Sequence, residues 1–243
     1  MSSWIDKFDS YVLGSEPVKN QHSKLLAKRE LIYNIETQDV KPGYSSEYLA
    51  NAAKMLPEIH NSAKVPAQLY GQFVVQHGQL DRVYTIWKYV EGYKDLDLSI
   101  EGLKDIPAYT EYERTQGEML RNRAQQICYE FSFWPEYNDD YDGGIFEIRS
   151  YSLKPGCLYE WGNAWANAIK LREKDAVMGL CSQIGEMYTV HHIWRYADLQ
   201  QRKVERDSAW KSGTWGDCVI RTVPLIKSLN VNIIRATDYS PLR

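Results

Sequence analysis

The chain has 243 residues, a length that corresponds to one large domain or two small ones. Its 44% hydrophobic and 25% charged residues are typical of a folded globular protein and exclude a disordered chain. The net charge of −3 argues against a nucleic-acid-binding protein. The longest uncharged stretch, residues 65–80, is shorter than the roughly 20 apolar residues of a membrane span, so no transmembrane segment is expected.

Residues 1–30 carry five basic and four acidic residues, and they have neither the apolar core of a secretory signal nor the acid-poor composition of a mitochondrial presequence. We therefore treat them as an N-terminal extension. The four cysteines, Cys128, Cys157, Cys181 and Cys218, are too far apart for a metal finger. They are predicted to be reduced thiols, and no metal site or cofactor is expected.

Two blocks of sequence occur twice, in the same order. Residues 32–43 align with residues 145–156, and both blocks end in Lys-Pro-Gly. Residues 78–89 align with residues 185–196, with the Ile-Trp pair and the final Tyr in register. Two matches at nearly the same spacing indicate a tandem duplication of a unit of roughly 100 residues.

The first unit shows strand patterns near 31–38, 69–76, 82–89 and 127–134, and helical patterns near 43–58 and 108–125. The second unit begins with an alternating strand at 145–151, followed by a helix over 158–174. A hairpin over 178–184 and 187–196, a helix over 198–211 and a strand over 230–236 complete it. This β-α-β-β-α-β order is that of the ferredoxin-like fold.

A four-stranded sheet with helices on one side leaves its other face bare, and the aromatic residues here make that face apolar. We therefore expect the two sheets to pack face to face, with the helices outside. The predicted class is α+β, built from tandem ferredoxin-like units as a dimeric α+β barrel. The predicted divisions are the extension 1–30, a first unit 31–135 and a second unit 144–243, joined by the turn-rich segment 135–144.

Several motifs resemble the NipSnap family. They are Glu130-Phe-Ser-Phe-Trp134, Ile145-Phe-Glu-Ile-Arg-Ser-Tyr151 with Lys154-Pro-Gly156, Glu160-Trp-Gly-Asn-Ala-Trp165, Ser182-Gln-Ile-Gly-Glu186, Val190-His-His-Ile-Trp194, Asp198-Leu199, Ala209-Trp210 and Ser240-Pro-Leu242. The resemblance covers nearly the whole chain from about Leu25. It implies the same tandem barrel and a mitochondrial location, with links to mitochondrial quality control (mitophagy) and vesicle traffic. It carries no catalytic residues to transfer.

His191-His192 is the densest chemical feature of the sequence. Adjacent residues of a strand point to opposite faces, so His192 shares a face with Trp194, whereas His191 lies on the other. One histidine facing the barrel interior would bind a ligand or move a proton, and the candidate pocket is His192, Trp194, Tyr151 and His191. The alternative is a hydrogen-bonded histidine in an aromatic core.

Two short segments remain. Asn138–Gly143 imitates the start of a calcium loop, but Arg149 stands where the loop needs a bidentate glutamate, so a turn is expected. Tyr93-Lys-Asp-Leu96 fits the aromatic-x-x-aliphatic pattern that autophagy adaptors bind, and it is predicted to lie in a loop.

The sequence contains no glycine-rich phosphate loop, zinc-protease motif or esterase motif. This absence leads us to expect a non-enzymatic protein. The resemblance to the NipSnap family implies a mitochondrial interaction protein, with mitochondrial and autophagy-related proteins as partners. Peripheral membrane association and a homo-oligomer stay open. The alternative is a small-ligand-binding or cofactor-poor oxygenase-like protein that uses the barrel interior.

Overall fold

The structure is a computed structural model that describes residues 30–137, here called the first half, and residues 143–243, the second half. The strands are β1 (Ile32–Val40), β2 (Gln68–His77), β3 (Arg82–Tyr89), β4 (Leu120–Glu130), β5 (Ile145–Leu153), β6 (Ala176–Ile184), β7 (Thr189–Tyr196) and β8 (Ile226–Ala236). The helices are α3 (Ser45–His60), α4 (Tyr93–Leu103), α5 (Tyr109–Met119), α6 (Leu158–Ala168), α7 (Leu199–Trp210) and α8 (Gly213–Thr222), with short 3-10 helices η1 (Ile169–Asp175) and η2 (Val223–Leu225).

The eight strands form a closed antiparallel barrel in the order β1-β3-β2-β8-β5-β7-β6-β4. Each half contributes four neighbouring strands in the same relative order, β4-β1-β3-β2 and β8-β5-β7-β6. The predicted α+β class and the tandem barrel are confirmed. The two sheets are also hydrogen-bonded to each other, through β2 with β8 and β4 with β6, so the barrel has no free edge strand.

The duplication is visible in the backbone itself. β1 and β5 have the same length and the same pattern of burial along the strand. After each of these strands a lysine side chain reaches back to a backbone carbonyl, from Lys41 to Glu118 and from Lys154 to Pro224, both at 2.6 Å. The glycine of each Lys-Pro-Gly turn has a positive φ, 87° at Gly43 and 84° at Gly156, a conformation that glycine adopts without strain.

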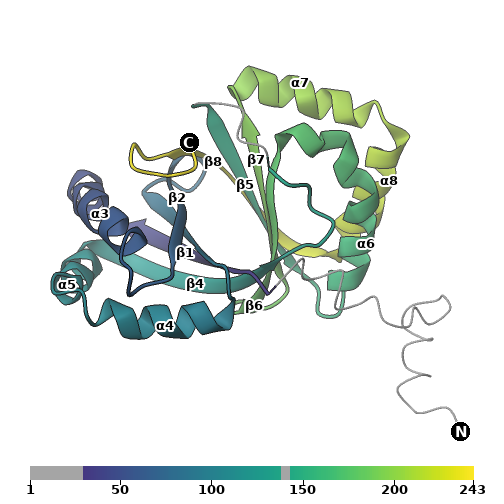
Figure 1. Ribbon diagram of the computed structural model, residues 1–243. Coiled ribbons are helices and arrows are strands. Elements are labelled where there is room, and N and C mark those ends of the chain that lie inside the picture. The colour runs from purple at the N-terminus through teal and green to yellow at the C-terminus, as the bar shows by residue number, and fades with distance from the viewer. Residues whose placement is uncertain (1–29, 138–142) are drawn as a thin grey trace, which may run out of the picture.

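The barrel is filled by side chains, and the helices cover its outside. The buried interior cluster includes Ile35, Phe73, Phe146, Ile148 and Ile193, and so draws on both halves. In Figure 1, α3, α4 and α5 gather on one side of the barrel, and α6, α7 and α8 on the other. Two further clusters lie between the barrel and the helices on these sides.

The structure corrects several predicted boundaries. The helix expected over 108–125 ends at Met119, and the strand expected over 127–134 begins at Leu120. The first part of β4 is exposed and polar, so it lacks the apolar alternation that marks a strand. α4 and α8 were not predicted. α4 buries only Asp95, Ser99 and Gly102, which form no apolar stripe.

Candidate functional site

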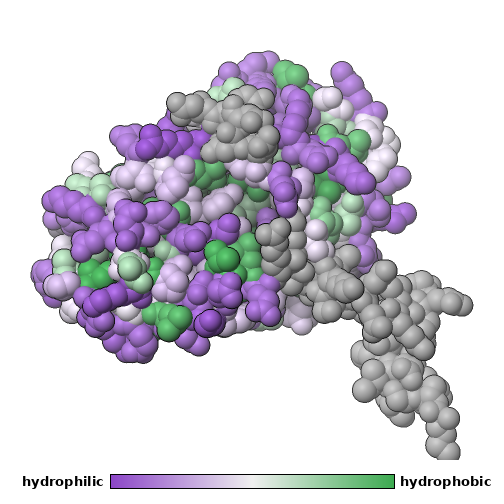
Figure 2. Space-filling model, viewed as in Figure 1, coloured by the Kyte–Doolittle hydropathy of each residue, from purple (hydrophilic) through white to green (hydrophobic). Residues whose placement is uncertain are grey.

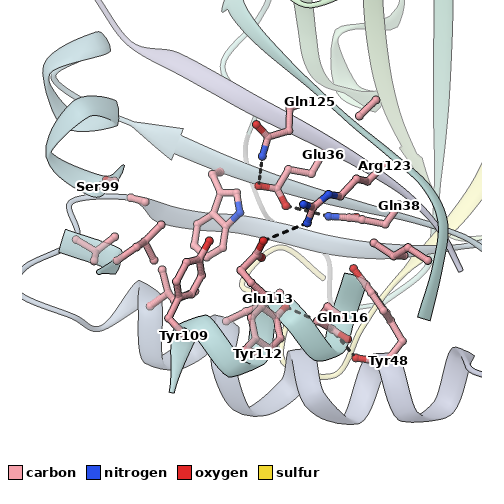
Figure 3. A pocket seen from close by; sticks show the side chains of 18 of the residues that line it. Glu36, Gln38, Tyr48, Ser99, Tyr109, Tyr112, Glu113, Gln116, Arg123 and Gln125 are labelled. Atoms are coloured by element: carbon pink, nitrogen blue, oxygen red, sulfur yellow. Dashed lines mark hydrogen bonds and ion pairs between the residues drawn. The ribbon is translucent and has the colours of Figure 1, made fainter. Parts of the chain in front are cut away.

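A cavity of about 390 Å³, here called the first-half cavity, lies between the outer face of β1, β3 and β4 and the helices α3, α4 and α5. Figure 3 shows side chains from the strands and from α5 approaching each other across it. Its polar lining consists of Glu36, Gln38, Tyr48, Tyr89, Ser99, Tyr109, Tyr112, Glu113, Gln116, Arg123 and Gln125. Its apolar lining consists of Leu56, Ile59, Val65, Ala67, Trp87, Leu103, Leu120 and Ala124.

Glu36 is the central acidic group of this cavity. Because alternate residues of a strand share a face, Asn34, Glu36 and Gln38 of β1 all point away from the barrel interior. The Glu36 carboxylate accepts hydrogen bonds from Gln38 Nε2 at 2.9 Å and Asn34 Nδ2 at 3.2 Å. Gln125 Nε2, on the neighbouring strand β4, donates a third at 3.4 Å.

A one-way chain of hydrogen-bond donors leads to Glu36 from the C-terminal segment. The Tyr239 hydroxyl donates to Gln72 Oε1, and Gln72 Nε2 donates to Thr85 Oγ1 at 2.9 Å. Thr85 Oγ1 donates to Gln38 Oε1 at 3.3 Å, and Gln38 in turn donates to Glu36. This arrangement fixes the orientation of the Gln38 amide and leaves the Glu36 carboxylate as the final acceptor.

The pKa of Glu36 is raised to about 7, chiefly by desolvation and secondly by the nearby negative charge of Glu113. The hydrogen bonds from Gln38 and Gln125 and the charge of Arg123 oppose this shift only in part. Glu36 therefore populates both protonation states near neutral pH, the condition under which a carboxyl group takes up or releases a proton most easily.

The opening of the cavity is marked by an ion pair. Arg123 of β4 donates to Glu113 of α5 at 3.1 Å, and their side chains are 62% and 41% exposed. Deeper inside, Gln116 Nε2 donates to the Tyr48 carbonyl and to the Tyr112 hydroxyl, each at 3.2 Å. Its buried Oε1 has no partner among the described residues, so the wall offers a further acceptor. Burial raises the pKa of the Tyr48 and Tyr112 phenols, which therefore stay neutral.

The second half fills the corresponding space with larger side chains. Four aligned pairs, first half before second, are Gln38 and Tyr151, Tyr48 and Trp161, Ala52 and Trp165, and Thr85 and His192. In a fifth pair the chain crosses over: Ser240, near the end of the second half, packs beside Gln72 of the first, and Trp134, near the end of the first half, packs in the aromatic cluster of the second. The last pair follows from matching backbone hydrogen bonds, Ser240 to Thr237 and Trp134 to Phe131, both at 3.0 Å. The larger cavity thus lies on the side of the barrel where these tryptophans do not pack.

His192, Trp194 and Tyr151, predicted as a pocket, do lie together. His192 is fully buried, its ring centre is 5.1 Å from that of Tyr151 and 6.1 Å from that of Trp194, and burial lowers its pKa well below the usual value. Neither ring nitrogen has a hydrogen-bond partner among the described residues. These side chains face α6 and not the barrel interior, so the expected placement inside the barrel is wrong. That they bind a ligand stays a prediction.

His191 lies on the opposite face, with the interior residue Ile193. The Ser150 hydroxyl donates to its Nδ1 at 2.8 Å, and its Nε2 donates to Gln126 Oε1. Burial lowers the pKa of His191 to about 4, so the ring is neutral near pH 7. These contacts correspond to the structural alternative, a hydrogen-bonded core histidine.

The candidate adaptor segment lies elsewhere than expected. Tyr93 and Leu96 belong to the first turn of α4, so the predicted loop is wrong. Tyr93 is 38% exposed, whereas Leu96 packs partly buried against the core. Residues 138–142 of the calcium-like segment Asn138–Gly143, and residues 1–29 of the extension 1–30, lie outside the described residues.

Sequence analysis missed Glu36 and Arg123 as site residues. The available signal was the alternation of Asn34, Glu36 and Gln38 on a strand face that the fold covers with helices, where apolar residues are the norm. At the second-half positions aligned with Glu36 and Gln38, the chain has Arg149 and Tyr151. The difference between the two halves was therefore visible but was not interpreted.

Three further observations concern metal ligands, thiols and membrane-spanning helices. No group of three metal-binding side chains occurs within residues 30–137 and 143–243. All four cysteines are free, and only Cys157 is more than slightly exposed. Among the described helices, none is both long enough and apolar enough to cross a bilayer.

Comparisons with known proteins place the chain in a family. The sequence model of the NIPSNAP family matches residues 146–241. The chain is 38% identical to Protein NipSnap of Drosophila melanogaster, over 98% of this chain and 88% of that protein. It is 37% identical to Protein NipSnap homolog 2 of Homo sapiens, over 99% of this chain and 85% of that protein.

Solved structures show the same fold at low sequence identity. A putative monooxygenase from Lactobacillus acidophilus has a TM-score of 0.59 at 13% identity, covering 88% of this chain and 99% of that one. An anthrone oxidase-like protein also has a TM-score of 0.59, at 10% identity, covering 87% of this chain and 93% of that one. At such identities the likeness concerns the fold alone.

Proposed function

The chain belongs to the NipSnap family, and we propose that it binds a small aromatic molecule bearing a hydroxyl group in the first-half cavity, with Glu36 accepting the hydroxyl proton in a hydrogen bond. The observation that carries this proposal is the Glu36 carboxylate in a cavity lining, with a pKa raised to about 7. A carboxylate in this position forms a charge-assisted hydrogen bond with a weakly acidic hydroxyl group, and such a bond is stronger than one between neutral groups.

The class of ligand follows from the lining. Trp87, Tyr109 and Tyr112 supply aromatic surface, which favours a flat ring system. The Glu36 carboxylate and the unpaired Gln116 Oε1 are acceptors, so they favour a ligand that donates hydrogen bonds. The volume of about 390 Å³ fits a molecule of two or three fused rings.

Beta-naphthol, a two-ring phenol, tests this proposal, and its methyl ether is the matched probe without the donor proton. By isothermal titration at pH 8, beta-naphthol should bind the wild type about tenfold more tightly than the ether, since a hydrogen bond to a charged group contributes about 1.5–3 kcal/mol. Glu36→Gln should abolish that difference. Glu118→Gln, on the exposed surface of α5, is the control and should leave both affinities unchanged.

The pH dependence provides a second readout. Binding of beta-naphthol should weaken as the pH falls through about 7, because protonation removes the charge of Glu36. Binding of the ether should not change over the same range. Equal affinities for the phenol and the ether in the wild type would contradict the proposal.

A second candidate function is that of a mitochondrial interaction protein that binds autophagy adaptors in mitochondrial quality control or acts in vesicle traffic. It is supported by exposed apolar residues on α4, where Leu98 and Ile100 are 51% and 52% exposed and Tyr93 is 38% exposed. In Figure 2, separate hydrophobic residues stand among hydrophilic ones on the face that carries α4 and α5. Because Tyr93 begins a helix, a partner would bind the helix surface and not an extended strand.

Titration with a purified autophagy adaptor that binds aromatic-x-x-aliphatic segments tests this candidate. Tyr93→Ala and Leu98→Ser should each weaken binding severalfold, since truncating a central apolar contact typically costs more than about 1 kcal/mol. Leu80→Ser is the matched control, because Leu80 is 62% exposed but lies between β2 and β3. Failure of the wild type to bind, or equal loss in the control, would contradict this candidate.

A further inference from the structure

A second pocket lies in the other half of the molecule and has the opposite electrostatic character. It has a volume of about 130 Å³ and is lined by residues of β5, α6, α7 and α8, with η2 and β8 at its side. Among the described residues that line it, Arg149 and Arg206 are the charged ones. We call it the arginine–tryptophan pocket, because Trp161, Trp165, Trp210 and Trp215 also line it.

The arginines beside this pocket outnumber the carboxylates that face them. Glu147 is fully buried, and Arg202 donates to both of its oxygens, at 2.7 and 3.0 Å. Arg149 Nε lies 3.2 Å from a Glu147 oxygen without hydrogen-bond geometry, and Arg206 is 3.9 Å away. One carboxylate, already satisfied by Arg202, thus faces three guanidinium groups, and the positive charge of Arg149 and Arg206 is not balanced locally.

The wall has hydrogen-bond donors that lack acceptors. The buried indole N–H groups of Trp161 and Trp165 have no hydrogen-bond partner among the described residues, and Arg149 Nε, although close to Glu147, makes no hydrogen bond either. An unpaired buried donor costs about 1–3 kcal/mol, so a wall with several of them favours a ligand that accepts hydrogen bonds. Apolar residues continue outward from the pocket, where Trp210 is 53% and Val223 is 56% exposed.

We propose that the arginine–tryptophan pocket binds a small organic anion, in which a carboxylate is attached to an aromatic or aliphatic body. The carboxylate pairs with Arg206 and Arg149, for which a planar two-oxygen group is the natural partner. The body packs against Trp161 and Trp165 and extends toward Trp210. This assignment shares no residue with the first-half cavity and does not depend on the function proposed for it.

The duplication supports the view that the two halves bind ligands of different character. Arg149 of β5 occupies the position that Glu36 occupies in β1. The same strand position, covered by helices in both halves, thus carries a negative group in one half and a positive group in the other. The two pockets consequently select ligands of opposite hydrogen-bonding character.

Phenylbutyrate tests this site, with phenylbutanol as the neutral probe of similar shape. Isothermal titration should show the wild type binding phenylbutyrate at least about tenfold more tightly than phenylbutanol. In nitrogen-proton correlation spectra, the indole signals of Trp161 and Trp165 should shift on addition of phenylbutyrate. Equal affinity for the two probes, or indole signals that do not move, would overturn the proposal.

Matched variants on α7 locate the anion. Arg206→Gln should weaken phenylbutyrate binding about tenfold and leave phenylbutanol unchanged. Lys203→Gln, which removes the same charge one turn away but outside the pocket, should have little effect. Equal losses in the two variants would show a general charge effect and would overturn the site. Glu36→Gln should leave phenylbutyrate binding unchanged, so this test and that of the first-half cavity fail independently.

Discussion

At the scale of single residues, Glu36 and Arg149 show how one strand position acquires two chemistries. Arg149 lies beside a buried carboxylate that offsets part of its charge. Glu36 has amide donors and the exposed Arg123 near it, but no guanidinium bonded to it, so desolvation dominates and its pKa rises. The raised pKa therefore results from burial without a bonded cation.

This raised pKa predicts an effect of pH on stability. Between the ordinary pKa of 4.5 and the folded value of about 7, the folded state holds a proton that the unfolded state has lost. The free energy of unfolding therefore falls as the pH rises through this range, by at most about 3 kcal/mol. In urea titrations, the free energy of unfolding of Glu36→Gln, measured relative to the wild type, should increase by up to this amount between pH 5 and pH 8.

The comparison isolates Glu36 because the other titrating groups are shared. His191, with its pKa lowered to about 4, makes acid destabilising below pH 6.5, but it does so in both proteins. Glu118→Gln serves as the surface control. Parallel stability profiles of the wild type and Glu36→Gln would show that Glu36 titrates at its ordinary pKa.

At the scale of elements, the packing of the second half depends on a missing side chain in β6. Trp134 follows β4 and packs on His192 at 4.6 Å and on Trp194 at 5.4 Å between ring centres. It lies directly over Gly179, where an added Cβ would be 2.1 Å from the indole Cε3. The first-half residue aligned with Gly179 is Gln72. Its amide donates to Thr85 and so forms part of the hydrogen-bond chain that leads to Glu36.

Gly179→Ala should therefore destabilise the protein by about 1–3 kcal/mol, because Trp134 must shift within a filled aromatic cluster. Gly117→Ala is the matched control, since its new Cβ meets nothing within 4 Å and α5 gains helix propensity. Urea denaturation measures both. An unchanged stability of Gly179→Ala would mean that Trp134 does not hold this position.

At the scale of the whole molecule, the two halves form one barrel, but the helix-covered pockets on its outside differ between them. The pairing of β2 with β8 and of β4 with β6 joins the halves at both edges, and their interior side chains form one cluster. The helices of the two halves cover separate sides (Figure 1), so the two pockets lie apart. The C-terminal segment returns to the first half, where Ser240 Oγ accepts a hydrogen bond from the backbone of Gln72.

Much of this fold was predictable because duplication and alternation are strong local signals. β3 was predicted at its observed bounds, and β1, β2, β5 and β7 within a few residues of theirs. The exposed start of β4 and the helix α4 were not found, because their burial patterns follow from tertiary contacts and not from a local period. The segment Tyr93–Leu96 was misplaced for the same reason.

Sequence pattern alone was enough to reveal the duplication, the succession of strands in each half and the family, since these depend on local pattern and identity. Where space remains between the barrel and its helices depends on tertiary packing. An amphipathic strand has the same pattern whether the helix above it carries Trp165 or Ala52. Cavity volume and desolvation are sums over side chains distant in sequence, so the site at Glu36 became visible only once those side chains were brought together.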